Sequence, residues 1–255
     1  MLSSAFLTIA LATAAFSHPT KRQTGGVITS CTVPNTAALT FDDGPYIYSQ
    51  NIVDILDAKG AKGTFFVNGN NYGCIYGDTE RAALQNAYSK GHQIASHTWA
   101  HKDLATLTTD QVRSSPIDNE SQLTANAAAL EKILGIKVAF MRPPYGSYND
   151  GVLQVAAAHN QSVIIWDFDS GDSVGETAAN SEKDYDTLVA KHPSTILSLN
   201  HETVRDTTVL PHALDDLLGA GYNLVTVAEC LGLSPYLSVA APSAQDASWT
   251  CSNTN

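Results

Sequence analysis

Apolar and polar positions along the chain alternate between short apolar runs and amphipathic segments. The apolar run at residues 37–41 predicts a buried strand, and the Asp-Asp-Gly-Pro sequence at 42–45 ends it. Residues 50–59 carry apolar side chains at helical spacing, and Gly60 follows, which predicts a helix and its end. The same alternation predicts further strands near residues 63–67, 92–96, 138–141, 163–166, 196–200 and 223–225. It predicts further helices near residues 79–89, 121–134, 151–159, 183–191 and 210–218.

Seven predicted strands separated by helices favour a parallel sheet, because parallel strands need a crossover between them. The continuous apolar runs at 163–166 and 195–199 are typical of strands that are covered on both faces. A chain of 255 residues fits one domain of barrel size, and no internal repeat or low-complexity linker divides it. The sequence therefore predicts an α/β fold, a (β/α) barrel of about seven parallel strands.

The two ends of the chain differ from this domain. Residues 2–16 are apolar and are followed by small residues, as in a secretory signal, and residues 18–22 end in a Lys-Arg pair typical of a processed pro-segment. We therefore expect a leader at 1–22, one domain at 23–237 and a Ser/Ala-rich C-terminal tail at 238–255. The leader predicts that the protein is secreted and extracellular.

An even number of cysteines, Cys31, Cys74, Cys230 and Cys251, favours disulfides in a secreted chain, with three pairings possible. Cys31 precedes the first of the strands identified above and Cys230 follows the last, so a bridge between them would join the ends of the domain. Cys74 and Cys251 would then pin the tail to the loop at 68–77. One bridge with two free thiols is the alternative.

The charge balance excludes several classes of partner. Fourteen Lys and Arg stand against 25 Asp and Glu, a net charge of −11, and an acidic surface repels nucleic acid and anionic membranes. No apolar run after the first residues reaches the length of a membrane span. Asn119 and Asn160 stand in Asn-Glu-Ser and Asn-Gln-Ser triplets, which are acceptor sequences for N-linked glycans.

Residues that can bind a metal or move a proton gather where the predicted strands end. In barrels of parallel strands, the active site forms at the carboxyl ends of the strands. We therefore expect these side chains to lie close together at one end of the barrel. They are Asp42 and Asp43 after the first strand, His97 and His101 after the third, Arg142 and Tyr145 after the fourth, Asp169 and Asp172 after the fifth, and His201 after the sixth.

His97 and His101 are spaced so that they would share one face of a helix and could hold a cation, if this segment were helical. Two such histidines on their own are common surface residues. With Asp43 they make a set of two nitrogens and one oxygen with open coordination positions, which suits Zn²⁺ or another divalent transition ion.

The neighbouring Asp42 can have a different task, because adjacent side chains diverge in an extended segment. An ordinary surface turn is the alternative for this pair of acids. The Arg-Pro-Pro-Tyr-Gly loop at 142–146 is stiff and can hold Arg142 toward a carboxylate and present a backbone N–H to an oxyanion, or it is merely a rigid connection. His201 is either a hydrogen-bonded histidine at the core's edge or the proton donor for a leaving group.

In this order, these segments resemble the motifs of the polysaccharide deacetylase family, the carbohydrate esterases with a NodB-homology domain. TFDDGP at 40–45 resembles the first motif, HTWAH at 97–101 the second, RPPYG at 142–146 the third and LNH at 199–201 the last. The resemblance spans about residues 37–233 and implies a distorted (β/α) barrel with the family's catalytic domain over 23–237.

The resemblance implies a metal-assisted hydrolysis of acetyl groups without a serine nucleophile. Asp42 would be the general base, held ionised and oriented by Arg142. Asp43, His97 and His101 would hold one divalent ion, zinc first, with cobalt or nickel as alternatives. When bound, the ion would polarise the acetyl carbonyl and acidify a water molecule.

The remaining implied roles belong to the leaving group and the pocket. His201 would be the general acid, and Asp172 would position its imidazole, with Asp169 as the alternative carboxylate. Tyr145 would donate its backbone N–H to the oxyanion, and Leu199 would line the pocket for the acetyl methyl group. The chain departs from the family at Ser173, where a Trp usually follows the Asp and forms an apolar wall.

The leader and the loop sequence NGNNYGCIYG at 68–77 look most like those of secreted fungal chitin deacetylases. This implies a monomer, extracellular or associated with the cell wall, that takes chitin or chitooligosaccharides and releases acetate. Acetylated xylan and other N-acetylated polysaccharides such as peptidoglycan are the alternatives.

Two hypotheses of other classes fit the sequence less well. A non-catalytic carbohydrate-binding protein predicts loss of the base, a metal ligand or the acid, and all of these are present. A glycoside hydrolase needs two carboxylates beside a glycosidic bond and has no role for the two histidines.

Overall fold

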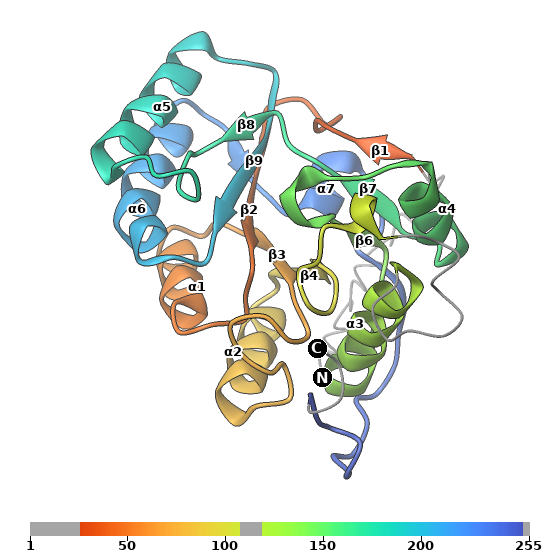
Figure 1. Cartoon of the computed structure of the whole chain (residues 1–255). Coiled ribbons are helices and arrows are strands. Elements are labelled where there is room, and N and C mark those ends of the chain that lie inside the picture. Colours follow the sequence, from red (N-terminus) through yellow and green to blue (C-terminus); the bar gives the residue numbers. More distant parts are fainter. Residues whose placement is uncertain (1–25, 108–118, 252–255) are drawn as a thin grey trace, which may run out of the picture.

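A parallel β-sheet forms the centre of the computed structural model, which describes residues 26–107 and 119–251 (Figure 1). Nine strands form this sheet in the order β1-β7-β6-β4-β3-β2-β9-β8, with β10 beside β2. They are β1 (Val27–Ile28), β2 (Thr36–Asp42), β3 (Gly63–Val67), β4 (Gln93–Ser96), β6 (Phe140–Met141), β7 (Ser162–Ile164), β8 (Phe168–Asp169), β9 (Thr195–His201) and β10 (Asn223–Leu224). The predicted α/β barrel is confirmed. The strand order is open, with β1 and β8 at its two ends, and these two strands are only two residues long each, which explains why the pattern of apolar residues missed them.

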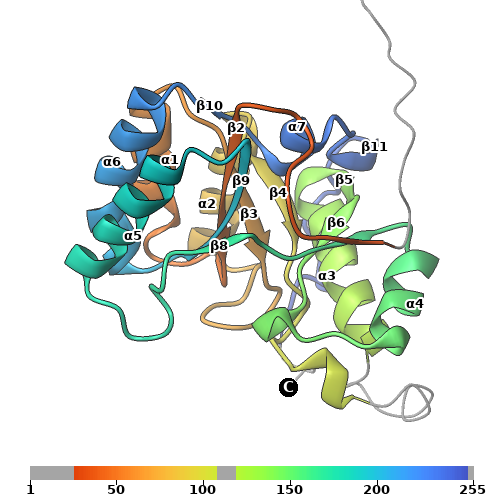
Figure 2. The ribbon, with the colours of Figure 1, turned by 90° about the horizontal axis from the view of Figure 1, so that it is seen from above.

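Helices surround the curved sheet, with α1, α5 and α6 near β9 and β2 at the left of Figure 2 and α3 and α4 near β6 and β7 at the right. None of the helices within the described ranges is long and apolar enough to cross a membrane. Helix α5 begins earlier than predicted because the Thr177 side chain caps it by accepting from the Asn180 N–H. The helices are α1 (Ser49–Ala58), α2 (Asp78–Ser89), α3 (Asn119–Leu134), α4 (Asp150–Ala158), α5 (Ala178–Lys191), α6 (Val204–Gly219) and α7 (Val227–Leu231).

The alternation of side chains along β2 places them in two separate cores, and a helix closes one end of the sheet. Leu39 and Phe41 belong to the large core with α1 and α6, whereas Ala38 belongs to a second core inside the barrel. Helix α7 closes the amino end of the sheet, since the Val227 N–H donates to Thr64 Oγ1 at 2.9 Å. The carboxyl ends of the strands are therefore left to form the site.

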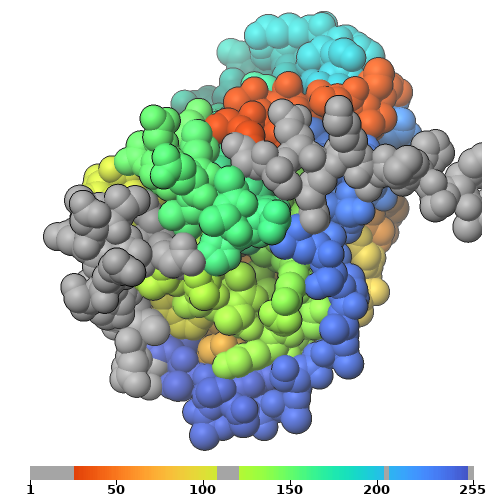
Figure 3. Space-filling view, turned by 90° about the vertical axis from the view of Figure 1, so that its right-hand side faces the viewer, coloured from red at the N-terminus to blue at the C-terminus, as the bar shows by residue number. Residues whose placement is uncertain are grey.

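The strand predicted at 138–141 is in fact two strands. Only β6 belongs to the main sheet, and β5 (Ile136–Val138) pairs antiparallel with β11 (Tyr236–Val239) in a separate small sheet. The tail boundary expected at Ser238 thus falls inside β11. Beyond it the chain runs along α3 and β5, with the Ser243 N–H donating to the Lys132 carbonyl at 2.9 Å (Figure 3).

Both expected disulfides are present. The Cys31–Cys230 bridge closes a separation of 199 residues and joins the two ends of the domain. The Cys74–Cys251 bridge holds the C-terminal segment against the loop after β3. Bridges that close loops of this size stabilise small domains by about 2–5 kcal/mol.

Some expectations concern residues about which the structure says little. The leader at 1–22 and the side chain of Asn119 lie outside the described part of the chain. The other triplet begins at Asn160, which is exposed in the turn between α4 and β7.

His92 is a buried titratable group at the opposite end of the barrel from the predicted site. Its Nδ1 accepts a hydrogen bond from the Gly63 N–H at 3.1 Å. Burial and the Lys62 charge lower the pKa of His92 from 6.5 to about 4, against the opposing charge of Asp57. Below pH 6.5 the unfolded state therefore binds a proton at His92 more readily than the native state does. The native state loses stability as the pH falls from about 6.5 toward 4.

We expect this one group to lower the free energy of unfolding by up to about 3 kcal/mol between pH 7 and pH 4. Urea denaturation should show a smaller acid loss for His92→Gln, whose amide oxygen can still accept from Gly63 but does not titrate. Equal acid losses in the two proteins would contradict the expectation.

Candidate active site

A cleft of about 500 Å³ opens at the carboxyl ends of the strands. Eight of the predicted site residues line it: Asp42, Asp43, His97, His101, Tyr145, Asp169, Leu199 and His201. The other two, Arg142 and Asp172, lie buried behind it. The structure thus brings together side chains from segments up to 159 residues apart.

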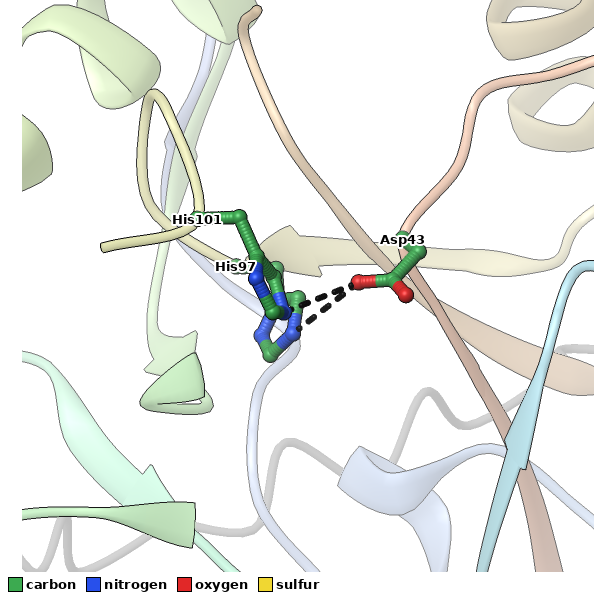
Figure 4. Close-up of side chains that lie close together, drawn as sticks. All are labelled: Asp43, His97 and His101. Atoms are coloured by element: carbon green, nitrogen blue, oxygen red, sulfur yellow. Dashed lines mark ion pairs between the residues drawn. The ribbon is translucent and has the colours of Figure 1, made fainter. Parts of the chain in front are cut away.

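Asp43, His97 and His101 form one cluster (Figure 4). Both imidazoles face the Asp43 carboxylate, and Asp43 Oδ1 lies 3.5 Å from His97 Nε2 and 3.1 Å from His101 Nε2. Their candidate ligand atoms all lie within 4.8 Å of one another. This spacing is suited to a shared cation.

The histidines do not stand on a helix, so that condition of the sequence argument is wrong. The segment after β4 is a loop in which Thr98 and His101 take left-handed φ angles of 74° and 51°. The Asn126 side chain from α3 holds this loop by donating to the Thr98 carbonyl at 2.8 Å. The loop turns back on itself and places both rings on the same side, 5.0 Å apart.

The divergence expected for Asp42 and Asp43 is also wrong, because the extended backbone ends between them. Asp42 is the last residue of β2, whereas Asp43 has a left-handed φ of 75°. Asp tolerates this region better than most residues. The turn brings both carboxylates to the same cleft, where the Asp43 carboxylate faces the histidines.

The hydrogen bonds of His97 show that the cluster fits a metal ion. Its ring is buried and its Nδ1 lies 2.8 Å from the Arg142 carbonyl, which only an Nδ1–H can satisfy. Burial lowers the pKa of His97, so the ring is neutral and Nε2 presents a lone pair toward Asp43. Asp43 Oδ1 is itself buried without an aligned hydrogen-bond donor among the described residues. The lone pairs of His97 Nε2 and Asp43 Oδ1 therefore face each other, and a backbone carbonyl holds the His97 ring in this orientation. This arrangement is typical of a metal site.

Asp42 is held by Arg142 rather than by the histidines. Arg142 Nη1 donates to Asp42 Oδ1 at 2.8 Å and to Thr40 Oγ1 at 2.6 Å. Its Nη2 donates to the Ile165 carbonyl at 3.0 Å, and the guanidinium lies 4.2 Å from the centre of the Phe66 ring. Arg142 is completely buried, so these contacts fix the Asp42 carboxylate in one orientation.

His201 lies across the cleft and is paired with Asp172. The Asp172 carboxylate accepts from His201 Nδ1 at 2.7 Å and from the His201 backbone N–H at 2.6 Å. Burial lowers the pKa of His201, but the hydrogen bond and charge of Asp172 outweigh it and raise the pKa to about 9. The imidazole therefore carries a proton at neutral pH and can donate it from Nε2.

Asp169 has another partner, so Asp172 is the carboxylate beside His201. Asp169 lines the cleft, but its Oδ1 accepts from the Gly171 N–H at 2.9 Å within its own turn. Ser173 lines the cleft as well and brings no apolar wall.

Sequence reasoning missed several cleft residues, namely Asn71, Tyr72, Gly146, Trp166 and Val174. Trp166 packs against Gly146 and beside Arg142, with 5.5 Å between the guanidinium and the ring centre, and supplies an aromatic wall. Its place at the end of a predicted strand could have identified it. Tyr72 could not be found this way, because it lies in the loop between β3 and α2 and not at the end of a strand.

A second group, Asp186, His212 and Asp216, has ligand spacing as well. It joins α5 to α6 on the surface, and His212 Nε2 lies 2.8 Å from Asp186 Oδ1. These side chains pair with one another and are largely exposed, which distinguishes them from the buried cluster in the cleft.

Comparison with known proteins agrees with this geometry. The family model for polysaccharide deacetylase matches residues 29–164. A chitin deacetylase from Pestalotiopsis sp is 36% identical over 244 residues, which cover 91% of this chain and 77% of that protein. A chitin deacetylase from Colletotrichum lindemuthianum is 33% identical, over 92% of this chain and 96% of that protein.

The solved structure of the Colletotrichum lindemuthianum chitin deacetylase superimposes with a TM-score of 0.74 at 30% identity. The match covers 83% of this chain and 94% of that structure. Fold, motifs and relatives therefore lead to one assignment: this chain belongs to the polysaccharide deacetylase family.

Proposed function

We propose that the protein is a secreted, metal-dependent chitin deacetylase that releases acetate from N-acetylglucosamine units of chitin or its oligomers. One observation carries the proposal: a three-ligand cation site lies in one cleft between a carboxylate held by Arg142 and an imidazole paired with Asp172. The chitin deacetylases among the relatives support the substrate, and the two disulfides support an oxidising, extracellular location.

The residues on one side of the cleft activate water. Asp43, His97 and His101 would hold a divalent ion, zinc first with cobalt or nickel as alternatives, that polarises the acetyl carbonyl and acidifies a water molecule. Asp42 takes a proton from this water as it attacks the carbonyl carbon. Arg142 and Thr40 keep the Asp42 carboxylate aimed into the cleft throughout.

The residues on the other side complete the hydrolysis. His201 gives its proton to the sugar nitrogen as the carbon–nitrogen bond breaks, which yields acetate and a free amine. The backbone N–H of Tyr145 donates a hydrogen bond to the carbonyl oxygen as that oxygen becomes negative. Tyr145 lies in a tight turn, where it has a left-handed φ of 61°. Leu199 and Trp166 line the pocket as its apolar side.

The experiment is acetate release from chitin oligomers and, separately, from acetylated xylan. The mature protein is assayed after metal removal and after zinc or cobalt is restored. Metal-dependent acetate from chitin oligomers is the expected result. Release of acetate from xylan alone would support the proposed mechanism but contradict chitin as the substrate. Release from neither polymer, with metal bound, would favour a non-catalytic binding protein.

Replacing Asp172 with Asn should shift the alkaline limb of the kcat/KM profile to lower pH. A general acid works only while protonated, so activity is lost as the pH rises through the pKa of His201. The neutral amide of this variant no longer supplies the charge that raises this pKa to about 9. Assays between pH 6 and pH 10 measure the shift.

The matched control for this test is Asp169→Asn. This carboxylate lies in the same turn but does not contact His201, so its loss should leave the alkaline limb in place. An alkaline limb that does not move in the Asp172 variant would remove His201 from the role of general acid.

A further inference from the structure

Glu202 is a buried acid for which the proposed reaction has no use. It follows His201 and is only 5% exposed. It is absent from the lining of the cleft, and its side chain instead borders a small apolar cavity with Phe65, Val67 and Leu84. A carboxyl group in such surroundings is costly unless a specific contact compensates for it.

The contacts of Glu202 bracket Asp43. On one side, the Glu202 backbone N–H donates to the Asp42 carbonyl at 3.1 Å. On the other side, the carboxyl group lies against Gly44, where a Cβ atom would stand only 1.6 Å from Glu202 Oε1. A larger residue at this position would displace the Glu202 carboxyl group, and the Gly44 carbonyl is fixed in turn by the Asn68 N–H at 2.8 Å.

The carboxyl group also organises the segment after Asp43, through Ser49. Ser49 Oγ accepts from the Tyr46 N–H at 2.7 Å and lies 2.8 Å from the Tyr46 carbonyl, to which it donates. The Ser49 hydroxyl also donates to Glu202 Oε2. The Tyr46 carbonyl has a second donor, the Ser49 backbone N–H at 3.1 Å, so the hydroxyl is available to the Glu202 carboxyl group.

The other carboxyl oxygen makes a charged state costly. Glu202 Oε1 is buried and has no hydrogen-bond partner among the described residues. Burial and the Asp43 and Asp42 charges raise the pKa of Glu202 to about 8, against the opposing hydrogen bonds from Ser49 and from the backbone of Tyr46. Burial and the neighbouring acids thus favour the neutral form of this carboxyl group.

We propose that Glu202 is a positioning residue that holds the backbone on both sides of Asp43 and thereby sets the Asp43 carboxylate toward His97 and His101. The left-handed conformation of Asp43 is sparsely populated in free peptides, so the surrounding structure must impose it. A neutral acid can do this without adding a third negative charge beside Asp42 and Asp43. The inference rests on the proposed metal site.

The test measures zinc affinity in the absence of substrate, by competition with a chromophoric chelator. Glu202→Gln keeps an oxygen that can accept from Ser49, so its Kd should stay within about threefold of the wild type. Glu202→Leu fills a similar volume but cannot bond to Ser49. Zinc should then bind about 10-fold more weakly, the lower end of the effect of losing a direct partner of a metal ligand, because Glu202 acts on Asp43 only through its neighbours. Ser49→Ala, a milder change, should fall between the two.

Thermal unfolding of the metal-free proteins separates positioning from stability. A folded Glu202→Leu protein with the zinc affinity of the wild type would overturn the proposal, as would a Glu202→Gln protein as weak as the leucine variant. If Glu202→Leu does not fold, unchanged zinc affinity of Ser49→Ala overturns it instead. Tight zinc binding by the wild type without acetate release would overturn only the proposed function.

Discussion

Replacing Asp42 with Asn is expected to lower kcat about 10²–10⁴-fold, the range found when a general base is removed. The amide has nearly the same shape, so Arg142 can still donate to its oxygen. It has no basic oxygen, however, and cannot take a proton from water. The measurement is the initial rate of acetate release from chitin oligomers at saturating substrate and saturating zinc.

The adjacent acid provides a matched control for this variant. Asp43 faces both imidazoles, whereas the nearest contact of Asp42 Oδ2 with them is 3.7 Å, to His97 Nε2. Asp42→Asn should therefore bind zinc as the wild type does, and Asp43→Asn should bind it weakly. An Asp42→Asn protein that retains wild-type kcat would remove Asp42 from the role of base.

Stability must be checked in the same variant, since Arg142 is completely buried. Loss of one partner of a buried ion pair typically costs about 3–5 kcal/mol. Here the guanidinium keeps Thr40, the Ile165 carbonyl and the face of Phe66 as partners, and the oxygen of the introduced amide remains as an acceptor. We therefore expect Asp42→Asn to fold, with a smaller loss than that range.

Metal removal is expected to abolish acetate release, and zinc, cobalt or nickel to restore it. His101→Ala should not be restored at the same metal concentration. Loss of an indirect partner already weakens metal sites about 10–100-fold, so loss of a direct ligand should weaken zinc binding by more than about 100-fold. Calorimetric titration of the metal-free proteins measures the affinities, and the acetate assay follows activity.

The surface group on α5 and α6 supplies the control for this prediction. His212 has carboxylate neighbours at similar distances but is exposed, so His212→Ala should leave the tight zinc site and the activity unchanged. A His101→Ala protein that binds one zinc ion as tightly as the wild type would contradict the ligand set in the cleft.

Most elements of the fold could be predicted because buried strands form continuous apolar runs bounded by turn residues, whereas helices carry apolar residues at helical spacing. Segments such as β2, β3 and β9 are buried along nearly their whole length, and their apolar runs are unambiguous. The two-residue strands β1 and β8 have no period at all and exist only through their pairing with β7 and β9. The division of 138–141 between two sheets depends on β11, nearly 100 residues later in the chain.

The sequence by itself determined which groups could reach the site. Each predicted site residue stands at or after the end of a strand, and parallel strands end on one edge whatever their exact register. The residue types then indicated the chemistry: two imidazoles and a carboxylate could bind a cation, and a further carboxylate and imidazole could act as base and acid.

Only the tertiary structure decided how these groups are aimed. The left-handed turns at Asp43 and His101 are local conformations that no periodicity of the sequence reports. They lie beside contacts made by distant residues, Asn126 with the Thr98 carbonyl and Glu202 with Gly44. The protonated state of His201 likewise depends on Asp172, which is 29 residues away in the chain. Strand ends are a property of local pattern, whereas the direction of a side chain and its charge depend on neighbours that folding brings together.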